Sequence, residues 1–336
     1  MLEQKPTIKD VAKAANVSIA TVSRALNGTA VVSTDTLERI EQAVHLLHYV
    51  PNTAAKQLAG RERLTLGFAI PHMRGDFFLP LLEGVERGAH EAGYGLLIHT
   101  VPQTSSASRP SLNPVNEHST DGLIIFPGSL SPTELTRLSA LKFPLVSLYQ
   151  AAEGYPEAPV VTFENRRSAY QLVRHLIEVH GRKRIAFLRG PGQQKDSLER
   201  EAGYCDALAE AGLTPLTGQG DYHEQCAFAT VRDWLEADIP FDAIFSGSDE
   251  AAVGALAALR QAEIPLPQQV AVVGFDDLRL ARHMSPPLTT VRLPIGDGGY
   301  LAAKTLVALI RKEVVTDTVL PTDLVIRTSC GCSCTP

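Results

Sequence analysis

A short stretch near the N-terminus, VSIATVSRALNG at residues 17–28, carries side chains suited to contact a polyanion. Ser18, Thr21 and Ser23 carry hydroxyl groups that donate and accept hydrogen bonds, and Arg24 can neutralise a phosphate or contact a base edge. Val22 and Leu26 form the inward edge of the stretch. The pattern predicts a short helix whose polar face meets nucleic acid. A capped helix facing water is the alternative.

The tail SCGCSC places Cys330, Cys332 and Cys334 close together, and such thiolates can bind a soft metal. No fourth ligand stands near them in the sequence, which favours a flexible, reducible tail. The ten histidines show no metalloprotease spacing, and GPGQQ at 190–194 lacks the lysine and the Ser/Thr of a phosphate-binding P-loop. No Ser/His/Asp set stands out. We therefore expect no enzyme, no catalytic residue, no metal and no cofactor.

Charge is spread unevenly along the 336 residues, of which 44% are hydrophobic and 20% charged, as in a folded chain. Residues 1–63 hold eight Lys or Arg against six Asp or Glu, a net charge of +2, which leaves −8 for the remainder of a chain of net charge −6. A mildly basic head on an acidic body indicates that only the head approaches a polyanion.

No segment reads as a targeting or membrane-spanning sequence. No apolar run follows the first methionine, and nothing approaches about 18 continuous apolar residues. The five cysteines do not form a disulfide framework spread over the fold. We expect a cytoplasmic protein with no membrane partner.

Three helices must hold the polar stretch in place. Thr7 caps the first, whose apolar face is formed by Ile8, Val11, Ala12 and Ala15. Asn16 suits a left-handed turn, and Ser18 caps the second helix. Ser33 caps the third helix, whose apolar face is formed by Leu37, Ile40, Val44 and Leu47. His48 follows this helix.

After Pro51, the segment NTAAKQLAG (52–60) has a candidate cap in Asn52 and a stop in Gly60. The segment is shorter than the roughly 12–15 residues that an isolated helix needs, so we expect a partner to order it.

From Leu64 onward, short apolar strands alternate with amphipathic helices. We expect strands at 64–71, 94–101, 121–128, 143–150, 160–165, 183–190, near 215–220, 242–249, 269–277 and 289–294, and helices at 79–92, 132–140, 165–180, 197–211, 224–236, 249–262 and 296–313. Such alternation predicts parallel sheets covered on both faces. Two series divided near Asn165 predict two lobes with a cleft at the carboxyl ends of their strands. Segment 105–119 fits poorly, because Pro110 and Pro114 would break the helix expected there.

Together these pieces resemble the lactose/galactose repressor (LacI/GalR) family of bacterial transcription regulators. The resemblance runs from TIKDVAKAANVSIATVSRALNG through YVPNTAAKQLAG to VVGFDD and PPLTTVRLP. It implies an α/β fold in which an all-α helix-turn-helix head precedes two doubly wound parallel-sheet lobes like those of periplasmic binding proteins. His48, the proline-rich 105–119 segment and the cysteine tail depart from the pattern.

The resemblance also implies how the head would meet DNA. It places Ile19 and Ala20 at the main base-reading positions, where both can contact only thymine methyls. It makes Leu58 a wedge in the minor groove, with Ala55 packed beside it. Two hinge segments must pack together to form this wedge, which implies a dimer. Leu58 packed onto the lobe is the alternative. The expected DNA-contacting set is Thr7, Ser18, Ile19, Ala20, Thr21, Ser23, Arg24, Asn27, Asn52, Ala55 and Leu58.

For the lobes, the resemblance maps a cleft arginine onto Arg200 and an acceptor onto Asp276, a pair that suits vicinal hydroxyls. An ion pair between the lobes is the alternative for these two. Tyr149 stands where a carboxylate is frequent, so relatives' hydroxyl networks need not transfer. The expected effector-binding set is Phe77, Phe78, Tyr149, Asp196, Arg200, Tyr222, Ser248 and Asp276.

These expectations describe a cytoplasmic repressor of a carbohydrate operon. It would bind double-stranded operator DNA as a homodimer or a dimer of dimers, although no long C-terminal heptad repeat supports a coiled coil. A sugar or sugar phosphate would control it, with a nucleobase or nucleoside as the alternative. The expected domains are a head (1–50), a hinge (51–63) and a core (64–336) of two lobes: about 64–164 with a crossing segment near 289–320, and about 165–288 with 321–330.

Two other classes of protein, a solute-binding protein and an enzyme, could have the same two lobes. A solute-binding protein for transport would need export, and a DNA-binding head replaces the signal peptide here. An enzyme on such a fold would need a catalytic set, which we do not find.

Replacing Ile19 and Ala20 together should change which operator sequence is preferred. The two positions would read thymine methyls, and a mismatched base pair costs about 1–3 kcal/mol. A mobility-shift assay on a panel of operator variants at fixed salt measures this. An unchanged order of preference would contradict the base-reading assignment.

Overall fold

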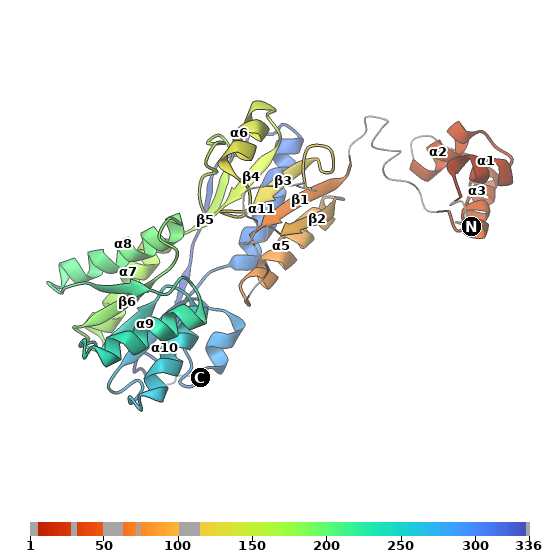
Figure 1. Ribbon diagram of the computed structural model, residues 1–336. Coiled ribbons are helices and arrows are strands. Elements are labelled where there is room, and N and C mark those ends of the chain that lie inside the picture. Colours follow the sequence, from red (N-terminus) through yellow and green to blue (C-terminus); the bar gives the residue numbers. More distant parts are fainter. Residues whose placement is uncertain are drawn as a thin grey trace. The chain divides into compact units, whose positions relative to one another are not determined.

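The computed structural model describes residues 6–27, 32–49, 63–71, 73, 75–100 and 115–333, and the chain divides into two compact units, Met1–Arg63 and Leu64–Pro336 (Figure 1). In its described part, the first unit contains α1 (Ile8–Ala14), α2 (Ile19–Asn27) and α3 (Thr34–Leu46). The segment expected as a hinge, with Asn52, Ala55 and Leu58, lies outside the described residues. So do residues 105–114 and Cys334.

The helices of the first unit begin and turn where the sequence predicts. The carboxylate of Asp10 accepts hydrogen bonds from the backbone N–H (2.8 Å) and the hydroxyl (2.7 Å) of Thr7, which fixes the start of α1. Asn16 has a φ of 53°, the left-handed value that the tight turn requires. The Ser18 hydroxyl accepts from the backbone N–H of Thr21 at 3.1 Å and caps α2.

One small core joins these three helices. Val11, Val22 and Ile40 are fully buried in it, with Ala15 beside them. The face of α3 differs from the expectation at one position, since Leu37 is 37% exposed and Ala43 is buried in its stead. Ala43 lies three residues after Ile40, so it shares the helix face that meets α1 and α2.

In the residues that the structure describes, the second unit contains two six-stranded sheets. The first has the order β11-β5-β4-β3-β1-β2 and the second β12-β10-β9-β8-β6-β7. Every pairing between neighbours is parallel except that of β12 with β10. The strands are β1 (Thr65–Ile70), β2 (Gly95–Thr100), β3 (Gly122–Ile125), β4 (Leu145–Leu148), β5 (Val160–Phe163), β6 (Ile185–Arg189), β7 (Leu216–Gln219), β8 (Ala243–Ser246), β9 (Ala271–Asp276), β10 (Thr289–Arg292), β11 (Thr318–Leu320) and β12 (Asp323–Val325).

Helices cover both faces of each sheet, as continuous apolar strands require. On the first sheet α5 and α11 pack together over one face and α6 covers the other, whereas α7 and α8 face α9 and α10 across the second sheet. The bounds are α5 (Phe78–Glu91), α6 (Pro132–Ala140), α7 (Asn165–Glu178), α8 (Lys195–Glu210), α9 (Glu224–Glu236), α10 (Asp249–Gln261) and α11 (Ile295–Ile310), with a 3-10 helix, η1 (Arg279–His283).

The chain crosses between the sheets three times, after β5, after β10 and after β11 (Figure 1). The crossing segment was expected to begin near residue 289, and this boundary is wrong, because β10 (Thr289–Arg292) pairs with β9 in the second sheet. The crossing segment therefore starts at Leu293, and α11 then packs on α5 of the first lobe.

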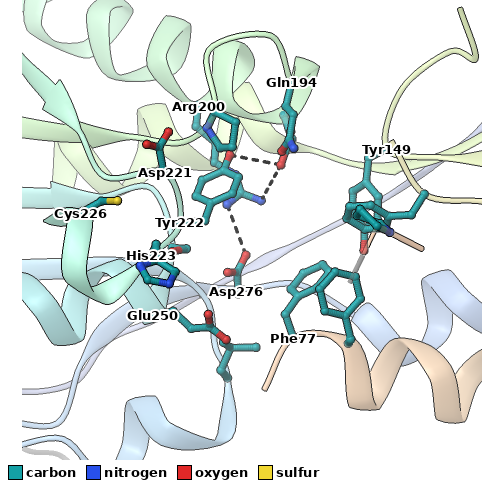
Figure 2. Close-up of a pocket in the computed structure, with 17 residues that line it drawn as sticks. Phe77, Tyr149, Gln194, Arg200, Asp221, Tyr222, His223, Cys226, Glu250 and Asp276 are labelled. Atoms are coloured by element: carbon teal, nitrogen blue, oxygen red, sulfur yellow. Dashed lines mark hydrogen bonds and ion pairs between the residues drawn. The ribbon is translucent and has the colours of Figure 1, made fainter. Parts of the chain in front are cut away.

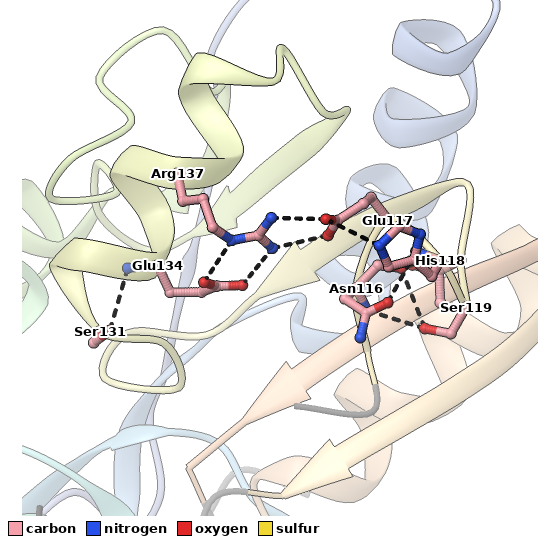
Figure 3. A network of polar contacts seen from close by, with 8 residues as sticks. Asn116, Glu117, His118, Ser119, Ser131, Glu134 and Arg137 are labelled. Atoms are coloured by element: carbon pink, nitrogen blue, oxygen red, sulfur yellow. Dashed lines mark hydrogen bonds and ion pairs between the residues drawn. The ribbon is translucent and has the colours of Figure 1, made fainter. Parts of the chain in front are cut away.

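The described end of the 105–119 segment is a turn fixed by an ionic network (Figure 3). The guanidinium of Arg137 donates to both carboxylate oxygens of Glu117, at 2.7 and 2.8 Å, and also to Glu134. These bonds lower the pKa of Glu117 to about 2. The network joins the segment that precedes β3 to α6. Both pack on one face of the first sheet.

Gly84 sits where α5 and α11 cross, and a Cβ there would lie 1.9 Å from the carbonyl oxygen of Gly296. Gly84→Ala should therefore separate the helices and lower the free energy of unfolding by about 1–3 kcal/mol or more. Gly296→Ala is the matched control, since its Cβ would meet only the Pro80 carbonyl oxygen, at 3.4 Å. Thermal unfolding measures both variants, and equal melting temperatures would contradict this packing.

Candidate functional site

A cavity of about 390 Å³ opens where strands of both sheets end (Figure 2). The residues that follow β3, β4, β7 and β8 line it, as does the last residue of β9. This is the edge at which open parallel sheets bind ligands. All eight residues expected to bind an effector line this cavity: Phe77, Phe78, Tyr149, Asp196, Arg200, Tyr222, Ser248 and Asp276.

Arg200, on α8, is the central cation of the pocket and is 2% exposed. Its Nε donates to Asn165 Oδ1 (2.9 Å), and its Nη1 donates to the Gly247 carbonyl (2.5 Å) and to Asp276 Oδ1 (3.3 Å). The guanidinium carbon lies 4.0 Å from the ring centroid of Phe275. These contacts hold the guanidinium fixed toward the cavity.

Arg200 and Asp276 form an ion pair, but it does not join the lobes as the alternative to ligand contact would have it. Both residues belong to the second lobe, on α8 and at the end of β9. The pair therefore builds one wall of the pocket and leaves the lobes free to be joined by other contacts.

Carboxylates outnumber the cation around this pair. Asp196 lies 3.9 Å from Arg200, and Glu250 also lines the cavity. Burial raises the pKa of Asp276 to about 7, against the lowering effect of Arg200, and Asp196 and Glu250 raise it further. The pKa of Arg200 is raised, so the guanidinium stays charged.

The turn after β9 is strained and is held by polar contacts. Asp276 has a φ of 112° and Asp277 a φ of 53°, values that non-glycine residues rarely adopt. Buried Asp249 accepts from the Leu278 backbone N–H at 2.8 Å, and Arg327 donates to Asp277 at 2.6 Å. These bonds fix the backbone that presents the Asp276 carboxylate.

The opposite wall is aromatic and comes from the first lobe (Figure 2). Phe77 and Phe126 lie with ring centroids 5.9 and 5.1 Å from that of Tyr149. The Tyr149 hydroxyl is buried and has no hydrogen-bond partner within the described protein. Burial and Asp276 raise its pKa, so the hydroxyl keeps its proton and can donate it.

Two further expected residues already have structural partners. Ser248 Oγ accepts from the Ala251 backbone N–H at 3.1 Å and caps α10, and Tyr222 donates to Asp196 at 3.2 Å. The Tyr222 ring lies 5.3 Å from the Arg200 guanidinium carbon. Their capping and packing roles do not exclude ligand contact, since both side chains line the cavity.

Sequence reasoning missed other lining residues, among them Phe126, Gln194, Asp221 and Glu250. Phe126 directly follows β3 and Asp221 comes two residues after β7. Their place just beyond the carboxyl end of a strand was a usable signal. Glu250 had no such signal, because its position depends on how α10 meets the other lobe.

Hydrogen bonds between described residues join the lobes beside the cavity. Glu250 Oε1 accepts from the Asp76 backbone N–H at 2.9 Å, and Gln150 Oε1 accepts from the Lys195 backbone N–H at 3.0 Å. Each uses a side chain of one lobe and the backbone of the other. Movement of the lobes would break or exchange them.

In the first unit, the start of α2 presents an exposed face. Ile19 is 45% exposed, and Ala20 and Arg24 are exposed as well. The hydroxyls of Ser18 and Thr21 lie 2.8 Å apart and bond to each other. Of the other expected DNA-contacting residues, Thr7 is exposed at the start of α1, Ser23 is half-buried, and Asn27 ends α2.

No helix in the described part of the chain is long and apolar enough to cross a membrane.

The chain matches two family models and resembles known proteins along nearly its full length. The model described as bacterial regulatory proteins, lacI family, matches residues 7–52, and that of a periplasmic binding protein-like domain matches residues 173–330. The ribose operon repressor of Halalkalibacterium halodurans is 32% identical over 96% of both chains.

Many solved structures share the fold, two of which illustrate it. The lac repressor dimer bound to operator and the anti-inducer ONPF superposes with a TM-score of 0.85 and 26% identity, over 97% of this chain and 99% of that one. A complex of the transcriptional regulator CelR with cellobiose gives a TM-score of 0.70 and 28% identity, over 96% and 99%. The expected family and fold class are thus confirmed.

The raised pKa of Asp276 gives its carboxyl a distinctive effect on stability. Between about pH 4 and pH 7 the unfolded chain releases this proton and the folded chain keeps it, so stability falls as the pH rises through that window, by up to about 1.4 kcal/mol per pH unit. Asp276→Asn should make this slope shallower, while Asp249 and Glu250, whose pKa values burial also raises, keep their own contributions.

Asp206→Asn is the control. Asp206 pairs with Arg166 on the surface and its pKa is lowered, so both states are ionised above pH 5. Denaturant unfolding of both variants and the parent at pH 5 and pH 7.5 measures the slopes. A parent slope retained in Asp276→Asn would contradict the assignment.

Proposed function

The chain belongs to the lacI family of bacterial regulatory proteins, a family of DNA-binding transcription regulators rather than enzymes, and from this premise we propose that it represses a carbohydrate-utilisation operon under the control of a neutral sugar. The sugar would bind in the pocket between the lobes. The operator would be double-stranded DNA bound by the helix-turn-helix head.

One observation carries the choice of effector: a charged hydrogen-bonding wall faces an aromatic wall across the same cavity. Arg200 donates and Asp276 accepts, and a sugar hydroxyl does both. On the other side, the Tyr149 hydroxyl has no partner in the described protein and would find one in the ligand. The rings of Phe77 and Phe126 would lie against the apolar face of a sugar.

The charges of the pocket favour a neutral sugar over a sugar phosphate. Asp196, Asp221, Glu250 and Asp276 line the cavity, and the single arginine among the lining residues is already paired with one of them. A phosphate group would add negative charge beside these carboxylates, and the lining residues include no unpaired arginine to offset it.

A nucleobase or nucleoside is the competing ligand class, since the same rings would stack on a base. The names of the relatives support carbohydrate: one is a ribose operon repressor, and CelR was solved with cellobiose.

For the head, we propose that the exposed Ile19 and Ala20 enter the major groove at the start of α2. Arg24 would contact phosphate, and Leu58 would open a base step in the minor groove. The lac repressor structure is that of a dimer on operator, which supports a homodimer here, with a dimer of dimers as the larger alternative. We place the protein in the cytoplasm, where its operator is.

Sugar and operator would act on each other through the lobes. Closing or opening the lobes around the sugar would exchange the hydrogen bonds from Glu250 to Asp76 and from Gln150 to Lys195. If the sugar lowers operator affinity, the operator must lower sugar affinity by the same factor.

A thermal-shift screen tests the effector class directly. Matched neutral sugars, sugar phosphates and nucleosides are compared on the full chain, since a ligand at 100 times its Kd stabilises by about 2.7 kcal/mol. Hits are then added to a mobility shift with promoter DNA at about 0.1 M salt. Stabilisation by nucleosides or phosphates alone, or turnover of a sugar without DNA binding, would overturn the proposal.

Tyr149→Phe separates ligand binding from folding. The change removes a buried hydroxyl without a protein partner, so the melting temperature of the ligand-free chain should stay the same or rise. Affinity for the sugar should fall by about 5- to 150-fold, the loss of one hydrogen bond of about 1–3 kcal/mol. Calorimetric titration measures the affinity; Tyr155→Phe, outside the cavity lining, is the control.

A further inference from the structure

We propose that His175, His180, Cys330 and Cys332 form a structural Zn²⁺ site that ties the C-terminal segment to the end of α7. The nitrogen and sulfur atoms that these four side chains can offer all lie within 4.8 Å of one another. The site is distinct from the effector pocket, whose lining includes none of the four.

The spacing of the atoms fits a tetrahedral metal. His175 Nε2 and His180 Nε2 are 3.3 Å apart, and Cys332 Sγ lies 3.3 Å from the second and 3.7 Å from the first. With Zn–N near 2.0–2.1 Å and Zn–S near 2.3 Å, a tetrahedron has edges of about 3.3 Å between nitrogens and about 3.5 Å between nitrogen and sulfur. An ion placed among these atoms therefore needs little rearrangement.

The fold brings these ligands together from distant parts of the chain. His175 stands in the last turn of α7 and His180 just beyond the helix. Cys330 and Cys332 follow β12. Cys332 lies 152 residues after His180 in the sequence. Gly331, between them, has a φ of 112° and would bring a Cβ to 3.1 Å from His180 Nδ1, so a glycine is required there.

The surroundings suit a closed, structural site. Cys330 is fully buried, and its sulfur accepts a hydrogen bond from Thr289 Oγ1 at 3.2 Å, a contact that would orient and stabilise a thiolate. A surface recess lined by His180 and Cys332 gives an ion access. Two thiolates and two imidazoles leave no position open for substrate, and such a set selects zinc over the oxygen-preferring cations.

The site would fix one end of a helix that reaches the effector pocket. Asn165, the first residue of α7, accepts from Arg200, and His175 lies ten residues further along, about 15 Å at the rise of an α-helix. Zinc would thus anchor the far end of the helix that orients the central arginine.

The test uses the full, untagged chain, kept reduced and freed of metal, and titrated with Co²⁺. We expect one Co²⁺ per chain, with the intense visible absorption of a tetrahedral thiolate site, and its displacement by Zn²⁺. Zn²⁺ should also raise the melting temperature. Cys332→Ser and His180→Asn, both at partly exposed positions, should each weaken Co²⁺ binding by at least about tenfold.

Matched controls identify the ligands. Cys205→Ser and the exposed His90→Asn should bind Co²⁺ like the parent, and so should Cys334→Ser, whose cysteine lies outside the described residues. Melting without metal checks that every variant is folded. The proposal is overturned if the parent binds no Co²⁺, if Cys332→Ser binds it unchanged, or if Cys334→Ser loses it.

Discussion

The buried guanidinium of Arg200 is the contact on which the pocket depends. It extends from α8 and bonds to groups at three other places: Asn165 at the start of α7, Gly247 after β8, and Asp276 at the end of β9. A charge taken out of water needs such partners, since an unpaired one would cost several kcal/mol. The charge therefore fixes the relative positions of the elements that end at the cavity.

The parallel sheets explain why a pocket exists at that place. Apart from β12, the paired strands of each lobe run parallel and end at the same edge, so the loops that follow β3 and β4, which carry Phe126 and Tyr149, and the end of β9, which carries Asp276, converge. The three crossings join the lobes covalently, and the hydrogen bonds beside the cavity join them weakly. In the proposed function, such a connection would let a ligand change the lobe arrangement at modest cost.

Much of this could be predicted, because the signals are local. The caps at Thr7 and Ser18 and the left-handed Asn16 depend on atoms within three or four residues, so the head was readable from its sequence. The alternation of apolar strands with amphipathic helices depends on burial of whole faces, and it predicted the two lobes. The one-position error at Leu37 shows the limit, since the helix face is decided by what packs against it.

The sequence by itself determined most of the elements, their order and, through resemblance, eight of the residues that line the cavity. Only the tertiary structure decided how those residues pair. Arg200 meets Asp276 within one lobe, the Tyr149 hydroxyl is left without a partner in the described protein, and His180 meets Cys332 across 152 residues. Local propensity carries no information about such contacts, because they arise where separate strands and helices end side by side, and that is fixed only when the sheets pack.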